Sequence, residues 1–365
     1  MGFKCAIVGL PNVGKSTLFN ALTQTAAAQA ENYPFCTIEP NVGEVAVPEP
    51  RLPEIARIGG SKEQIPARMN FVDIAGLVRG ASRGEGLGNQ FLSNIRETDA
   101  IAYVLRCFDD EDVTHVDGRV DPLADLDTVQ TELMLADLES LEKRRVALEK
   151  KARQNDKEAR QTLRLVDLAL AELNEGRPAR AAKIEKDDRK AWRMLQLLTA
   201  KPVLYVANVD EDSAATGNAY SDKVLTHARA EGAQAVIISA QIESELALLE
   251  DEECKEYLAD LGLEEPGLNR LIHTGYKLLG LQTYFTVGPK EARAWTFHEG
   301  WTAPRCAGVI HTDFERGFIR AETIAYEDFI KYGGEQGARE AGKVRQEGKS
   351  YVVQDGDILH FKFNV

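Results

Sequence analysis

The segment GLPNVGKS, residues 9–16, decides the fold. It fits the pattern GxxxxGK[ST] and lies between an apolar run, residues 4–9, and a segment with helical spacing, residues 17–24. In that context the pattern predicts a loop whose backbone N–H groups converge on the phosphates of a nucleotide. We expect Lys15 to pair with the β and γ phosphates and Ser16 to ligate Mg²⁺. The predicted contacts to the nucleotide from this loop are Asn12, Val13, Gly14, Lys15, Ser16 and Thr17.

Apolar runs typical of strands alternate with helical segments along the first 110 residues. The predicted strands are KCAIVG (4–9), VGEVAV (42–47), MNFVDIAG (69–76) and AIAYVLRCF (100–108), and two more lie in KPVLYVANVD (201–210) and AQAVIISA (233–240). Strands that alternate with helices predict an α/β fold with a mostly parallel, doubly wound sheet. The predicted nucleotide-binding domain spans residues 1–280.

A helical segment, residues 123–199, interrupts this alternation. Its leucines and valines recur at helical intervals, which predicts two antiparallel helices packed like a coiled coil. From residue 281 to 365 the pattern changes to short strands, predicted in TYFTVG, AWTFHEG, AGVIHTDF, GFIRAETI and DILHFKFNV. We therefore expect a separate β-rich domain over residues 281–365.

Two further segments carry residues suited to phosphoryl chemistry. DIAG, residues 73–76, ends a predicted strand, so Asp73 is expected in the Mg²⁺ shell and the Gly76 amide near the γ-phosphate. YPFCTIEPNVG, residues 33–43, contains one aliphatic hydroxyl, that of Thr37, in a predicted switch loop. The predicted metal ligands are Ser16, Thr37 and Asp73.

The motif that reads the base departs from the guanine pattern Asn-Lys-x-Asp. Residues 208–211 read NVDE, so Val209 replaces the lysine and Glu211 the aspartate. Adenine lacks the two donors that the aspartate would bind, and loss of such a hydrogen-bonding edge changes selectivity by about 10⁴-fold. We therefore expect ATP rather than GTP. The alternative is that Asn208, with Ser239 and Ala240 in the following turn, still favours guanine.

The residue after DxxG, where many GTPases have a glutamine that orients water, is Leu77. His115, in a loop after the fourth predicted strand, is the candidate to orient or deprotonate water. Its alternative is a solvated loop histidine. A carbonyl oxygen from Asn12 would help to coordinate K⁺, and its alternative is a turn-forming asparagine. Slow turnover without a partner is expected.

Composition limits the remaining possibilities. The chain is 44% hydrophobic and 28% charged, and its five cysteines are scattered singly. No apolar stretch is long enough to cross a membrane, so we expect a cytoplasmic protein with reduced thiols and no membrane partner. A net charge of −14 argues against general coating of nucleic acid, and no DNA partner is expected. Residues 141–201 nevertheless hold 17 Lys and Arg against 10 Asp and Glu, which suits either an RNA contact or a solvated helix surface.

Taken together, GLPNVGKSTLFNALT (9–23), DIAGLVRGASRGEGLGNQFL (73–92), the helical insertion and the strand-rich end resemble the YchF subfamily of Obg-like P-loop ATPases. The resemblance covers the whole chain. It implies a TGS domain of β-grasp type at the end, an altered base motif of the form NxxE with a preference for ATP, and hydrolysis coupled to binding of the ribosome, through the large subunit and ribosomal RNA. Two alternatives remain open: an Obg-type GTPase, and a ribosome- or RNA-binding factor with incidental nucleotide turnover.

Overall fold

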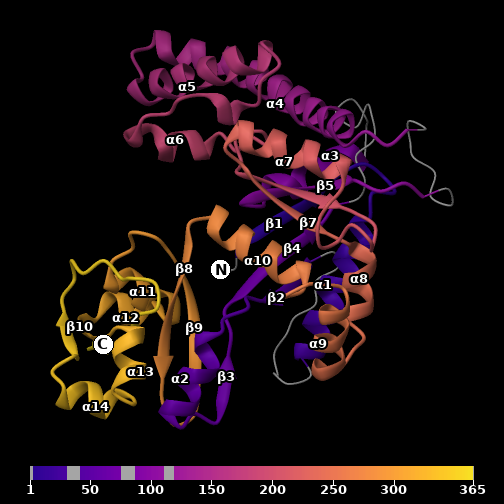
Figure 1. Cartoon of the computed structure of the whole chain (residues 1–365). Helices are drawn as coiled ribbons and strands as arrows, with labels where there is room; N and C mark the ends of the chain where they lie inside the picture. Colours follow the sequence, from indigo (N-terminus) through magenta and orange to yellow (C-terminus); the bar gives the residue numbers. More distant parts are fainter. Residues whose placement is uncertain (1–2, 31–41, 75–86, 111–118, 365) are drawn as a thin grey trace. The chain divides into compact units, whose positions relative to one another are not determined.

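The computed structural model describes residues 3–30, 42–74, 87–110 and 119–364, which form two compact units (Figure 1). The first unit is made from residues 3–43 and 70–271, and the second from residues 44–69 and 272–365, with the gaps just given. Among the helices so described, none is long and apolar enough to span a membrane.

A six-stranded sheet forms the centre of the first unit, in the order β2-β4-β1-β5-β6-β7. Its strands are β1 (Lys4–Val8), β2 (Val42–Ala46), β4 (Arg68–Asp73), β5 (Ala100–Arg106), β6 (Val203–Asn208) and β7 (Gln234–Ile238). β1 pairs in parallel with β4 and β5, and the parallel pairing continues through β6 to β7. Every residue of β5 and β6 is buried, as expected for central strands covered on both faces. The predicted parallel α/β sheet is confirmed.

Helices connect these strands and place loops at their carboxyl ends. They are α1 (Lys15–Ala30), α3 (Leu87–Arg96), α7 (Ala219–Glu231), α8 (Ala240–Leu246), α9 (Asp251–Asp260) and α10 (Gly267–Leu278). Asn218 begins α7 with a capping box, and Ser239 begins α8 by accepting a hydrogen bond from the Ile242 N–H. Since α1 follows β1 and α8 follows β7, both helices start where parallel strands end.

The insertion consists of α4 (Pro122–Arg153), α5 (Lys157–Asn174), the short 3₁₀ helices η2 (Ala179–Ala181) and η3 (Lys186–Asp188), and α6 (Arg189–Met194). Asp121 caps α4 and Asp156 caps α5, each by accepting a backbone hydrogen bond from three residues ahead. α4 and α5 lie side by side (Figure 1). Their seam buries Leu141, Leu165 and Val166, so the predicted helical insertion is present.

The second unit has a mixed sheet in the order β11-β10-β12-β8-β9-β3. Its elements are α2 (Arg51–Gly59), β3 (Glu63–Ile65), β8 (Leu281–Val287), β9 (Glu291–His298), α11 (Ala303–Ile310), α12 (Thr312–Arg316), β10 (Phe318–Ile324), α13 (Tyr326–Lys331), α14 (Glu335–Glu340), β11 (Arg345–Glu347) and β12 (Ile358–Phe363). β8 and β9 form an antiparallel hairpin, and β12 runs parallel to β8. This mixed order fits the β-grasp type that the resemblance implies.

Two features of the second unit differ from what the sequence predicted. The predicted strand AGVIHTDF, residues 307–314, is wrong. This segment forms the end of α11 and the start of α12. Pro304 is tolerated in the first turn of α11, and Ala303, Cys306 and Ala307 are all buried at helical spacing. Residues 44–69 also belong to this unit, since β3 pairs in parallel with β9. The boundary between residues 280 and 281 stays a prediction.

Candidate nucleotide-binding site

Two glycines give the loop after β1 its shape. A Cβ on Gly9 would lie 2.4 Å from the Val104 carbonyl oxygen, so only glycine fits beside β5. At Gly14, φ is 93°, and a Cβ there would lie 2.2 Å from the side-chain nitrogen of Asn208. α1 begins at the next residue, Lys15, so the unpaired N–H groups of a 16-residue helix directly follow the loop. This is the local structure that binds phosphate groups.

Lys15 lies inside this loop rather than on the surface. Its side chain is only 5% exposed, and Nζ donates a hydrogen bond to the Leu10 carbonyl oxygen at 2.5 Å. Burial lowers the pKa of Lys15 to about 8, and the negative charge of Asp73 opposes that shift. The amine is thus held at the phosphate loop with part of its solvation removed.

Asp73 is placed beside this loop by strand pairing. It is the last residue of β4 and lies opposite Ile7 of the parallel neighbour β1. Burial raises the pKa of Asp73, and the charge of Lys15 opposes the increase. Among the residues that the structure describes, no donor hydrogen-bonds the buried Oδ1 atom of Asp73. A buried carboxylate oxygen without a donor suits a hard cation such as Mg²⁺.

Ser16 supplies a second oxygen of the required kind. It lies exposed in the first turn of α1, next to Lys15. Ser16 and Asp73 therefore fit Mg²⁺, which in nucleotide sites also takes phosphate oxygens and water as ligands. The described residues contain no group of three or more His, Cys, Asp or Glu that could hold a metal ion.

Asn208 connects three segments that are predicted to contact the nucleotide. It ends β6 and is 3% exposed. Its Nδ2 donates a hydrogen bond to the Val13 carbonyl oxygen at 2.9 Å, and its Oδ1 accepts one from the Ala240 N–H at 2.9 Å. One side chain thus joins the phosphate loop, the end of β6 and the start of α8.

The neighbours of Asn208 in the base motif have different environments. Val209 is buried, and its N–H donates to the Ile238 carbonyl oxygen at 2.9 Å. Glu211 is partly exposed two residues further on, where the chain has left the strand. Ser239 is buried as the cap of α8. A small apolar side chain therefore takes the position where a guanine reader has a lysine.

The structure brings together Val13, Gly14, Lys15, Asn208 and Ala240 and places Asp73 near Lys15. Asn12, Ser16 and Thr17 lie exposed on the same loop and first helical turn. Thr37, Gly76 and His115 lie outside the described residues. The sequence did not predict the Leu10 carbonyl as the partner of Lys15, because a backbone oxygen leaves no signal in residue type.

Several known proteins are similar to this chain along its whole length. A protein from Haemophilus influenzae named ribosome-binding ATPase YchF is 59% identical over 365 residues, with both chains fully covered. Those from Escherichia coli O157:H7 and Bacillus subtilis, under the same name, are 56% and 53% identical, again with full coverage of both chains. The chain belongs to the YchF family. A family model of the YchF carboxyl-terminal region, described as a protein of unknown function, matches residues 281–364, and one described as a 50S ribosome-binding GTPase matches residues 4–131.

Solved structures agree with membership of the YchF family. The YchF GTPase of Schizosaccharomyces pombe matches with a TM-score of 0.88 and 38% identity, covering 99% of this chain and 98% of that one. A GTP-binding protein from Pyrococcus horikoshii OT3, at 19% identity, TM-score 0.63, and coverage of 99% and 100%, shares the fold. YchF membership makes the chain a nucleotide hydrolase of the P-loop GTPase class. The bacterial YchF names say ATPase and the S. pombe name says GTPase, so the names differ on the base that is bound.

Proposed function

We propose that this chain binds ATP, hydrolyses it to ADP and phosphate, and associates with the large ribosomal subunit in a nucleotide-dependent way in the cytoplasm. The bacterial YchF relatives, at 53% to 59% identity, support this function by their name. The arrangement around Lys15 and Asn208 supports nucleotide binding independently of that name.

The base motif is the observation on which the choice of ATP rests. Asn208 is held between Val13 and Ala240, so the motif keeps its structural anchor. Val209 is buried and apolar, and it offers neither the stem nor the charge with which a lysine covers guanine. Glu211 is longer by one methylene than the aspartate that would accept both guanine donors. A site without that fitted acceptor loses its advantage for guanine, whereas adenine, which lacks both donors, loses nothing.

The phosphate end of the site has residues for each task of phosphoryl transfer. In the proposal, Lys15 exchanges the Leu10 carbonyl for phosphate oxygens, and the start of α1 adds its N–H groups. Ser16, Thr37 and Asp73 would hold Mg²⁺, which supplies neutralisation of phosphate charge when bound. His115 is proposed to orient the attacking water, since Leu77 cannot, and Asn12 to help coordinate K⁺. Asn12 has a φ of 62°, in the left-handed region that asparagine tolerates, so it also forms the turn of the loop.

Steady-state hydrolysis tests the proposal. Wild-type protein is assayed with ATP and with GTP, alone and with purified 50S subunits, beside Lys15→Ala and His115→Ala. We expect slow ATP turnover that 50S subunits change, no turnover by Lys15→Ala, and slower turnover but preserved ATP affinity in His115→Ala. Faster hydrolysis of GTP than of ATP contradicts the nucleotide assignment. A rate indifferent to subunits that do bind the protein indicates a ribosome-binding factor with incidental turnover.

A further inference from the structure

Some cations of the helical insertion have partners within it and others do not, a difference that the sequence does not show. The cluster most obvious in sequence, Lys143 to Arg145, is used within the insertion itself. Lys143 pairs with Glu139 at 2.5 Å, and Arg145 pairs with Asp167 at 2.8 Å. Arg144 donates to the Leu195 carbonyl oxygen at 2.8 Å. Two of the three charges in this cluster are therefore paired within the insertion, and the third is held against a backbone oxygen.

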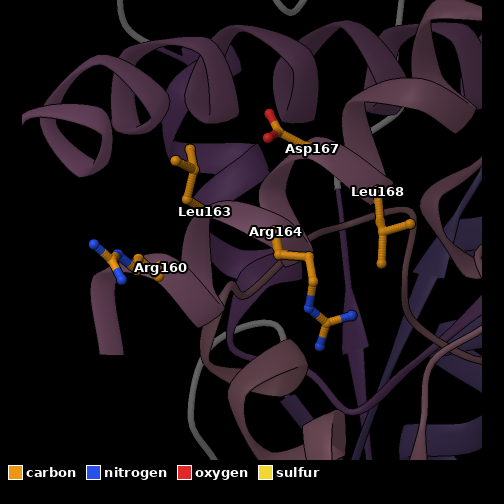
Figure 2. A pocket seen from close by; sticks show the side chains of 5 residues that line it. All are labelled: Arg160, Leu163, Arg164, Asp167 and Leu168. Carbon is orange, nitrogen blue, oxygen red and sulfur yellow. The ribbon is translucent and has the colours of Figure 1, made fainter. Parts of the chain in front are cut away.

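A hollow on α5 is lined by further charged side chains (Figure 2). It measures about 430 Å³ and is lined by Arg160, Leu163, Arg164, Asp167 and Leu168. Arg164 pairs with Asp188, Asp167 receives Arg145, and Arg160 donates to the Asn155 side chain. Each charged group that lines it already has a partner within the insertion.

The second hollow, on η3 and α6, is different. It measures about 580 Å³, and its lining contains four cations and no carboxylate. The residues that line it are Lys186, Arg189, Lys190, Arg193, Met194 and Gln196. All six are exposed, Met194 to 70%. Within the described residues, none of these four cationic side chains forms a salt bridge or hydrogen bond.

The four cations share one surface because of their spacing. Positions 186, 189, 190 and 193 are separated by three, one and three residues, which places their side chains along one face of a helix. We call these four residues the α6 cationic face. Glu185 and Asp187 are close in sequence but do not line the hollow.

The backbone beneath the α6 cationic face is held in place by buried contacts. Asp188, between Lys186 and Arg189, accepts a hydrogen bond from Gln161 at 2.7 Å and pairs with Arg164. At the other end, Leu195 is buried, and the Gln196 carbonyl oxygen accepts from Arg96 at 2.9 Å. The cations are thus presented on a fixed frame, which lowers the entropy lost when they bind.

We propose that the α6 cationic face binds the phosphate backbone of a ribosomal RNA helix, an inference that rests on the proposed association with the ribosome. A chain of net charge −14 is repelled by RNA as a whole, so attraction has to come from a local group of unpaired cations. Lys and Arg without carboxylate neighbours are the side chains that contact phosphates. Because only the backbone is contacted, binding is independent of RNA sequence.

Two triple variants of equal charge test this assignment. Arg189→Gln, Lys190→Gln and Arg193→Gln remove three charges from the α6 cationic face. The matched control, Lys150→Gln, Lys151→Gln and Arg153→Gln, removes three exposed charges from the last turn of α4, for which the structure also gives no ion pair. Both proteins keep their ATPase activity, since neither triple touches the nucleotide site. Cosedimentation with 50S subunits and fluorescence anisotropy with short RNA duplexes of two sequences are measured over a salt titration.

We expect the α6 triple to lose at least about tenfold in affinity for 50S subunits and for both duplexes, with the salt slope smaller by about 2 to 3. The control triple stays near wild type. Equal loss in both triples overturns the assignment, because affinity then follows net charge. Loss for subunits but not for duplexes also overturns it and points to an acidic protein segment. If the wild-type protein binds the duplexes through this face but does not bind 50S subunits, the proposed association with the ribosome is wrong, whereas the RNA-binding surface is confirmed.

Discussion

Lys15 is a buried amine whose charge changes near physiological pH. Because burial lowers its pKa to about 8, it is protonated below that pH and increasingly neutral above it. ATP phosphates attract only the charged form, so affinity should be constant below pH 8 and fall above it, by up to about tenfold per pH unit. Binding should therefore take up about half a proton at pH 8 and more at higher pH.

Calorimetry in buffers of different ionisation enthalpy measures that uptake directly. Lys15→Gln serves as the control, since its weak binding should be independent of pH over the same range. An affinity for ATP that is constant to pH 9 in wild type would show that Lys15 keeps its proton in the free protein.

Asn208 should contribute to affinity through the loop it holds. Asn208→Ala leaves the Val13 carbonyl and the Ala240 N–H without their buried partner, at a cost of about 1 to 3 kcal/mol each. We expect ATP affinity to fall at least tenfold, about 1.4 kcal/mol. Asn208→Asp keeps the acceptor for Ala240 but places a charged oxygen against the Val13 carbonyl oxygen, so it should lose at least as much. Equal affinities of the three proteins, measured by calorimetry, would show that this bridge does not organise the site.

For single residues, the sequence predicted which side chains lie around the phosphate loop. Lys15, Asp73 and Asn208 belong to motifs whose chemistry fixes the residue type, and the structure places them around one loop. Contacts made through backbone could not be predicted. The Leu10 carbonyl that binds Lys15 and the Val104 carbonyl that excludes a side chain at Gly9 depend on how the chain is folded, not on residue type.

One buried carboxylate joins two segments of the helical insertion. Asp137 of α4 is fully buried and accepts hydrogen bonds from the N–H groups of Leu198 and Thr199 at 2.9 and 2.8 Å and from the Thr199 hydroxyl at 2.8 Å. It thereby fixes the segment that returns from α6 to β6. Asp137→Ala should lower the free energy of unfolding by about 2 to 5 kcal/mol, because three buried donors lose their acceptor.

Thermal unfolding combined with hydrogen exchange measures that effect. Faster exchange should be confined to α5, α6 and the segment up to Thr199. The exposed Asp187→Ala is the matched control, and no change is expected for it. Uniform acceleration over the whole chain would mean that Asp137 does not act on the insertion in particular.

The type of an element could be predicted where apolar residues form a long run or repeat regularly over many turns. It could not be predicted where the apolar pattern is short. The runs that became β5 and β6 are apolar throughout, and α4 and α5 repeat leucines over many turns. Residues 307–314 have the local pattern of a strand, because Val309, Ile310 and Phe314 favour strands. Ala303 and Ala307 favour a helix, but Pro304 and Gly308 beside them weaken that signal in the sequence.

For the whole molecule, the second unit is assembled from two distant parts of the sequence. Arg51 of α2 pairs with Glu49 at 2.6 Å and with Asp355 at 2.8 Å, and its guanidinium lies 5.3 Å from the ring centroid of Phe285. β3 completes the sheet beside β9. No periodicity within residues 44–69 could have shown this, because the partner strand lies more than 200 residues further along the chain.

A fragment comparison follows from this assembly. Residues 281–365 alone lack α2 and β3, so we expect them to unfold at a lower temperature than the same region with residues 44–69 joined through a flexible linker. Circular dichroism during heating measures the difference. If both fragments unfold at the same temperature, residues 44–69 add nothing to the stability of the second unit.

The proposed preference for adenine is tested by titrating the purified protein with ATP and with GTP, with Mg²⁺ and K⁺ present. We predict ATP binding tighter by at least tenfold, about 1.4 kcal/mol, and a shift toward GTP in Val209→Lys with Glu211→Asp. Tighter binding of GTP by the wild-type protein would contradict the account and make the chain a GTPase.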